Sequence, residues 1–137
     1  MGKTESEIVQ NFFKVITHLK IFHWQTRFFS SHKSADALVE ELMDSMDEFM
    51  EIYQGMTGKR IKLVPSCSLS FSNMTNKKIV KILNEFSQYM QRLESIVCDN
   101  KSSKIKGNEC PQTLALLNQR DEIVGKIQQT LYLLTFI

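Results

Sequence analysis

Apolar residues recur at helical spacing through four long segments of this chain, and no other sequence feature limits the fold as strongly. Five glycines and two prolines among 137 residues leave little material for tight turns. The longest segments are rich in Leu, Lys, Glu, Gln and Met, which favour helix. The sequence therefore predicts an all-α protein.

The segments between these helices predict how the helices connect. A loop through Phe28 and Phe29 is so short that the first two helices should form an antiparallel hairpin. Residues 56–74 have no sustained helical period, so we expect a long crossing connection that links two parallel neighbours and could include a short turn of helix. The predicted helices run from about 5 to 26, from Ser30 or Ser31 to Gly55 or Gly58, from Thr75 or Asn76 to about 98, and from Pro111 onward.

Helix ends and core positions follow from the same pattern. Thr4 and Glu7 are spaced as a capping box, and a serine at 30 or 31 is expected to cap the second helix. With 42% apolar residues, the chain is long enough for one compact core, and we expect a single domain over residues 1–137. Predicted core positions include Ile8, Phe12, Val15, Leu19, Phe22, Ala35, Leu38, Leu42, Met43, Phe49, Ile79, Leu83, Phe86, Met90, Leu93, Leu114, Ile127 and Leu134. Four helices with one long crossover between the second and third are the ferritin-like four-helix arrangement.

Charge and cysteine content exclude several classes of protein. The formal charge is only +2, with 17 basic and 15 acidic residues mixed along the chain, so nothing favours nucleic acid globally. The sole basic candidate for DNA is the loop that carries Lys101, Lys104 and Lys106, and a solvated loop explains it better, so no DNA partner is predicted. The three cysteines are odd in number and irregularly spaced, which indicates a reducing compartment. Without a secretory signal or a membrane span, we expect a soluble intracellular (cytoplasmic) protein with no membrane partner.

Four residues of the second predicted helix are placed symmetrically about a point between residues 41 and 42: His32, Asp36, Asp47 and Glu51. On a helix they share one stripe about 100° wide, yet the two ends of the set lie roughly 17 to 28 Å apart along the axis. One metal ion cannot touch both ends. A second copy of the helix, laid antiparallel across a twofold axis, would bring each histidine end opposite the partner's acidic end. The spacing predicts a metal site assembled from two subunits.

His23 adds a fifth candidate ligand, because the end of the first helix packs beside the start of the second in an antiparallel hairpin. His23 is followed by Trp24, and the pattern His23-Trp24, His32-x3-Asp36-x10-Asp47-x3-Glu51 resembles the ferroxidase centre of the Dps family, the mini-ferritins. The resemblance covers roughly residues 10–55. In that family the two histidines come from one subunit and the acidic pair from its twofold mate.

The resemblance implies a function and an assembly. Iron(II) would bind between subunits at His23, His32, Asp36, Asp47 and Glu51 as a di-iron or mono-iron site, and peroxide or dioxygen would oxidise it. Manganese and zinc also suit carboxylate and imidazole ligands. The resemblance further implies a twofold homodimer through the second helix and, in the family, a closed dodecamer. Under this hypothesis the protein is a ferroxidase that sequesters iron.

An alternative hypothesis is structural. The chain also resembles small ferritin-like proteins encoded by large DNA viruses, where a bundle of this kind would be an assembly or virion component with a vestigial metal site. The interval from His23 to His32 is about three residues shorter than is usual in the Dps family, and such a loop could rotate His32 away from the partner helix. His18 lies about 140° around the helix from His23 and is predicted to stay outside the site, at a polar boundary.

Overall fold

The computed structural model describes residues 2–99 and 114–136, and regular structure in these two ranges is entirely helical. The helices are α1 (Lys3–Gln25), α2 (Phe29–Thr57), α3 (Asn76–Gln91), α4 (Leu93–Asp99) and α5 (Leu114–Leu133). The all-α prediction is confirmed for this part of the chain. Cys110, Pro111 and the lysines at 101, 104 and 106 lie outside the described residues.

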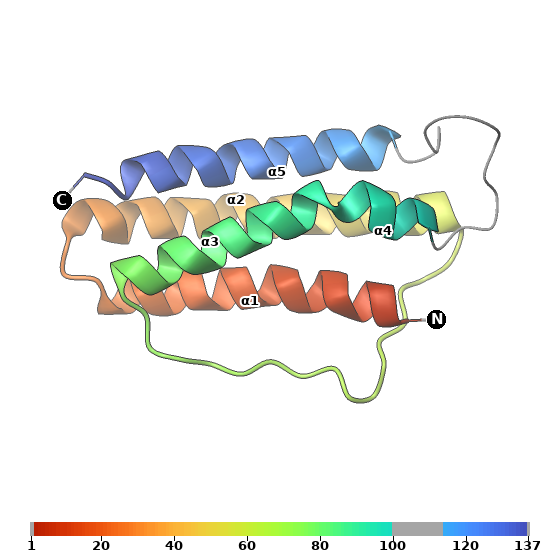
Figure 1. Ribbon diagram of the computed structural model, residues 1–137, viewed down its shortest axis with the longest axis horizontal. Helices are drawn as coiled ribbons and strands as arrows, with labels where there is room; N and C mark the ends of the chain where they lie inside the picture. Colours follow the sequence, from red (N-terminus) through yellow and green to blue (C-terminus); the bar gives the residue numbers. More distant parts are fainter. Residues whose placement is uncertain (1, 100–113, 137) are drawn as a thin grey trace.

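The long helices lie side by side, and Figure 1 shows their directions. The hairpin of α1 and α2 is antiparallel, and residues 58–75 then run back along the molecule so that α3 is parallel to α2. The crossing connection was predicted correctly, but its two helices are not neighbours. Both α1 and α5 contact α2 and α3, so α2 and α3 lie diagonally across the packing.

Polar side chains of α1 hold the crossing connection against the helices. Ser6 Oγ accepts a hydrogen bond from the backbone N–H of Val64 at 2.8 Å, and Gln25 Oε1 accepts one from Met74 at 2.6 Å. Between them, Gln10 donates to the carbonyl of Ser68. The connection contains no turn of helix, only a turn at Val64–Cys67. Because α1 satisfies part of its backbone, the connection stays ordered without regular structure of its own.

The end of α2 and the start of α3 were predicted correctly from the sequence. Gly58 follows α2 with φ at 70°, the left-handed conformation that glycine adopts most easily, and it ends the helix. Thr75 caps α3, since its hydroxyl accepts from the backbone N–H of Lys78 at 3.2 Å.

Two predicted caps are wrong. Helix α1 begins at Lys3 with Gly2 as its N-cap, so Thr4 lies inside the helix and the capping box is misplaced. Helix α2 begins at Phe29 after an extended Phe28, and Ser30 and Ser31 belong to its first turn. The hydroxyl of Ser30 donates instead to the carbonyl of Phe136 at 2.7 Å, so a contact distant in sequence replaces the local cap.

The core lies where the helical period predicted in most of α1, α2 and α3. In α5 the predicted face is wrong in part: Leu117, Val124 and Leu131 are only partly buried, whereas Leu116 and Ile123 are fully buried. Phe12 packs against Phe49 and Phe86 with ring centroids 5.4 and 5.3 Å apart, which joins α1, α2 and α3. Met43 is half exposed and Leu114 is 60% exposed, so both predictions of burial are wrong. Met43 stands at the edge of the apolar stripe of α2, where a small rotation of the helix decides exposure. Leu114 lies about 160° around α5 from the buried Leu116, so it faces away from the core.

The third predicted helix is divided at Arg92 into α3 and α4. Neither proline nor glycine is present there. The hydroxyl of Ser95 donates to the carbonyl of Arg92 at 2.9 Å. Such side-chain bonds to the preceding turn compete with the helical backbone bond and bend helices.

Tyr89 gives a prediction about stability. Its hydroxyl is buried without a hydrogen-bond partner among the described residues, and burial, with Glu7 nearby, raises its pKa. Removing an unpaired buried hydroxyl relieves its desolvation cost, so Tyr89→Phe should raise the free energy of unfolding by about 1 kcal/mol. Because the folded pKa lies above the unfolded value, wild-type stability should also fall as pH rises above 10, and the variant should lose less.

Thermal unfolding monitored by circular dichroism measures this effect. The matched control is Tyr132→Phe, since Tyr132 is exposed and its substitution should leave the melting temperature unchanged. A lower melting temperature for Tyr89→Phe would show that the hydroxyl is paired.

Candidate metal centre

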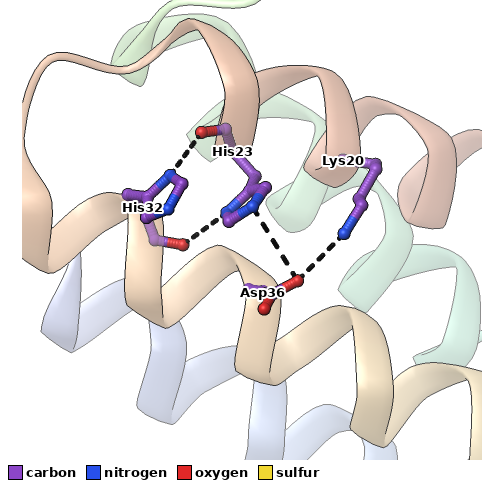
Figure 2. Close-up of polar contacts among 4 residues, drawn as sticks. All are labelled: Lys20, His23, His32 and Asp36. Carbon is purple, nitrogen blue, oxygen red and sulfur yellow. Dashed lines mark hydrogen bonds and ion pairs between the residues drawn. The ribbon is translucent and has the colours of Figure 1, made fainter.

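The hairpin of α1 and α2 brings His23 and His32 together. His23 lies in the last turn of α1 and His32 in the first turn of α2, with only residues 26–28 between the helices. Their rings stack with centroids 3.8 Å apart and an interplanar angle of 16°. The short loop therefore places His32 against His23, as Figure 2 shows.

Each histidine is bonded to the backbone of the other. The Nδ1 atom of His23 lies 2.7 Å from the carbonyl oxygen of His32, and Nδ1 of His32 lies 2.8 Å from the carbonyl oxygen of His23. A carbonyl oxygen only accepts, so both Nδ1 atoms must carry the proton. A neutral imidazole protonated at Nδ1 has its lone pair on Nε2, the arrangement that backbone carbonyls typically impose on metal-binding histidines.

Asp36 completes a local cluster one turn along α2 from His32. Its Oδ1 lies 4.0 Å from Nε2 of His23 and 3.0 Å from Nζ of Lys20 (Figure 2). Metal–ligand bonds are about 2.0 to 2.2 Å long, so an ion between these two atoms would have them on nearly opposite sides, and binding them as adjacent ligands requires the two side chains to move closer together. Lys20 was not predicted, although it precedes His23 by one turn and so shares its face of α1.

The electrostatics of this cluster are set first by Lys20. Its hydrogen bond is the largest cause and lowers the pKa of Asp36, and desolvation by burial opposes this. The charge of Lys20 and, when they are protonated, those of His23 and His32 lower the pKa further. Asp36 is consequently an anion at neutral pH. A folded pKa below the ordinary value means that this carboxylate stabilises the fold above pH 3.8 and that the contribution is lost as pH falls.

Substitution of Lys20 tests this description. Lys20→Met should raise the pKa of Asp36 toward its ordinary value of 3.8, because the donor that stabilises the carboxylate is removed. Titration of the Asp36 carboxyl carbon by NMR measures the shift. Lys14→Met is the control, since Lys14 is an exposed lysine on the same helix, and it should leave that titration unchanged. An unaltered Asp36 titration in Lys20→Met would show that the ion pair does not persist in solution.

Asp47 and Glu51 are not part of this cluster within one chain. Both are exposed on α2, which continues from Phe29 to Thr57 without a break. Eleven residues of helix separate Asp36 from Asp47, about 16 Å along the axis. Within the described ranges of a single chain, no three His, Cys, Asp or Glu side chains gather closely enough to hold a metal ion.

The exposed side of α2 has an uneven distribution of charge. Its first turns and the adjacent end of α1 carry Lys20, His23, His32 and Lys33. Its later turns carry six exposed acids and no base: Glu40, Glu41, Asp44, Asp47, Glu48 and Glu51. This face is therefore cationic near the histidine pair and anionic beyond the middle of the helix.

The two remaining aromatic candidates lie apart from the cluster. His18 is buried, with its Nδ1 2.7 Å from the carbonyl of Lys14 and its ring near Phe71, so it is a core residue and not one at a polar boundary. Trp24 is 68% exposed, which excludes it from the core.

Comparison with known proteins places the chain in a family. Residues 23–134 match the Family of unknown function (DUF5856). The chain belongs to this family. The match begins at His23 and includes all five candidate ligands. No curated protein matches the chain, and no solved structure does.

No helix among the described residues is both long and apolar enough to cross a lipid bilayer.

Proposed function

We propose that this protein is a Dps-like ferroxidase that binds Fe(II) between two subunits, oxidises it and sequesters the product. The observation that carries the proposal is the reciprocal histidine pair, in which two backbone carbonyls hold both Nδ1 protons and leave both Nε2 atoms as ligands. Two imidazoles beside an anionic carboxylate are a donor set suited to Fe(II), Mn(II) and Zn(II).

The order and directions of the helices also support the proposal. An antiparallel hairpin followed by a long crossing connection to a helix parallel to α2 is the order of helices expected of the ferritin-like four-helix bundle that we propose. Ligands in ordinary ferritin-like centres come from within one bundle through Glu-x-x-His pairs. This chain has no such pair. Four of its candidate ligands lie on the outer side of α2 and the fifth, His23, lies at the adjoining end of α1, so a complete site needs a second subunit.

Charge supports an antiparallel pairing of two α2 helices. A twofold axis between residues 41 and 42 places the cationic end of each helix against the anionic end of its partner, whereas a parallel pairing would oppose like charges. Asp36 would then lie opposite the partner's Asp47, and His32 opposite the partner's Glu51. Met43 would lie close to the axis, which gives this exposed side chain a contact that one chain does not provide.

The proposed reaction takes Fe(II) as its substrate. Two Fe(II) ions each give one electron to hydrogen peroxide, which takes up two protons and leaves as two waters. Asp36 and the partner's Asp47 and Glu51 would supply anionic oxygens, which favour the ferric product. The two imidazoles would be neutral ligands that add no further negative charge, and the oxidant would take a coordination position that the protein ligands leave open.

Anaerobic titration with Fe(II) followed by peroxide tests the proposal. We expect ferric absorbance to develop with the enzyme at a rate well above that of Fe(II) in buffer. Mass in solution and metal analysis accompany the assay. A closed dodecamer with bound iron supports the ferroxidase, whereas an isolated dimer that neither binds nor oxidises iron refutes it and favours the structural alternative.

A further inference from the structure

Six large apolar side chains are exposed at the end of the molecule where α1 and α5 end and where α2 and α3 begin (Figure 1). Phe29 is the most exposed of them, at 73%. Monomeric soluble proteins rarely leave a contiguous apolar patch of this kind uncovered unless it binds something. We call this surface the aromatic end; it consists of Trp24, Phe28, Phe29, Tyr132, Leu133 and Phe136.

The aromatic end is held in place by contacts between α2 and the residues that follow α5. Ser30 Oγ donates to the backbone carbonyl of Phe136 at 2.7 Å, which fixes the chain after α5 beside the start of α2. The rings of Tyr132 and Phe136 then pack edge to face with centroids 5.1 Å apart. The rings of Tyr132 and Phe136 are therefore positioned before any partner binds, which lowers the entropic cost of docking.

The charge around the aromatic end is mainly positive, and the nearest acid of α2, Asp36, is paired with Lys20. Residues 24–35, 71–80 and 128–136, which form this end of the molecule, contain no Asp or Glu. They carry four exposed bases: Arg27, Lys33, Lys77 and Lys78. Lys33 Nζ lies 5.5 Å from the centre of the Phe29 ring, so cationic and aromatic groups adjoin. The complementary partner is anionic at its surface and apolar beneath it.

We propose that the aromatic end docks on an anionic lipid membrane as a peripheral contact. Aromatic side chains prefer the membrane–water interface, and lysine and arginine add attraction to anionic headgroups. This contact needs no spanning helix. Single-stranded nucleic acid is a weaker match, because its affinity grows with the phosphates neutralised and this end carries only four exposed bases. A second copy presenting the same end would oppose like charges.

Trp24 is the only tryptophan and belongs to this surface, so its fluorescence reports docking directly. We expect a blue shift and co-sedimentation with vesicles in which about a third of the lipid is phosphatidylserine, and weaker binding to phosphatidylcholine alone. Added salt should weaken the binding. The assay contains no iron, so its outcome is separate from that of the ferroxidase.

Variants locate the contact. Phe28→Ser/Phe136→Ser should reduce partitioning into vesicles by about tenfold or more, because two apolar side chains no longer leave water. Arg27→Gln/Lys33→Gln should reduce the preference for phosphatidylserine. Phe13→Ser is the matched control: Phe13 is exposed to nearly the same degree as Phe28 but lies near the middle of α1, and its substitution should change nothing. Circular dichroism checks that each variant keeps its helices.

Three results would overturn the proposal. The wild-type protein could fail to bind phosphatidylserine vesicles, or the phenylalanine variant could bind as well as wild type. A single-stranded oligonucleotide could also bind at this end and exclude vesicles, which would assign the surface to nucleic acid. If the wild-type protein does not bind vesicles and the phenylalanine variant forms a smaller oligomer than wild type, the aromatic end is instead an interface between two copies of the chain.

Discussion

Asp47→Ala/Glu51→Ala should abolish peroxide-dependent oxidation of Fe(II), although neither residue contacts the histidine pair of its own chain. Both side chains are exposed on α2, and the pairing of two helices would carry them to the partner's histidines. Loss of residues that merely orient metal ligands costs 10- to 100-fold in affinity or activity, so loss of two ligands should cost about 100-fold or more. The measurement is the initial rate of ferric absorbance after peroxide is added to the anaerobic Fe(II) complex.

The control removes the same charge from the same helix. Glu41 and Glu48 are exposed acids of α2 that lie about 120° around the helix from Asp36 and Asp47. Glu41→Ala/Glu48→Ala should therefore keep oxidation within about twofold of wild type, since no proposed ligand changes. Mass in solution is measured for both variants, so that a lost dimer is not mistaken for a lost ligand. Equal rates of Fe(II) oxidation in Asp47→Ala/Glu51→Ala and wild type would refute the hypothesis that the site is shared between two subunits.

The part of the fold that follows from local patterns could be predicted from the sequence. The apolar period placed Phe12, Leu19 and Phe22 in the core, and the short loop predicted the hairpin that joins His23 to His32. These predictions succeed because helix periodicity and loop length constrain neighbours along the chain directly. Burial at the edge of a stripe is different, and Met43 is exposed because the rotation of α2 depends on all its neighbours at once.

The chemistry of the candidate centre depends on atoms that a residue pattern does not describe. The backbone carbonyl of each histidine sets the tautomer of the other histidine. Because every residue has a backbone carbonyl, the residue types in the sequence do not reveal this tautomer. Lys20 meets Asp36 only because α1 and α2 pack at one particular rotation. Ser30 was expected to cap α2, but a bond to Phe136 replaced that local role. In each case a tertiary contact determines the tautomer, the ion pair or the hydrogen bond, and the local sequence does not favour one alternative over the other.

The decisive test of a shared site is complementation between two inactive proteins. His23→Ala/His32→Ala lacks the imidazoles but keeps the acids, and Asp47→Ala/Glu51→Ala has the reverse defect. In a mixed twofold dimer, one of the two sites combines the intact histidines of one subunit with the intact acids of the other. When equal amounts are unfolded and refolded together, half of the dimers are mixed, so oxidation should recover to about a quarter of the wild-type rate.

The reverse mixture separates a shared site from a site within one chain. A protein carrying all four substitutions, refolded with an equal amount of wild type, forms mixed dimers in which neither site is complete. Only the wild-type dimers remain active, so the rate per total protein should fall to about a quarter of the wild-type value. A site formed within one chain would retain about half, because each wild-type subunit keeps its activity whatever its partner is. Recovery in the first mixture together with a quarter in the second requires that histidines and acids from different subunits act on the same iron.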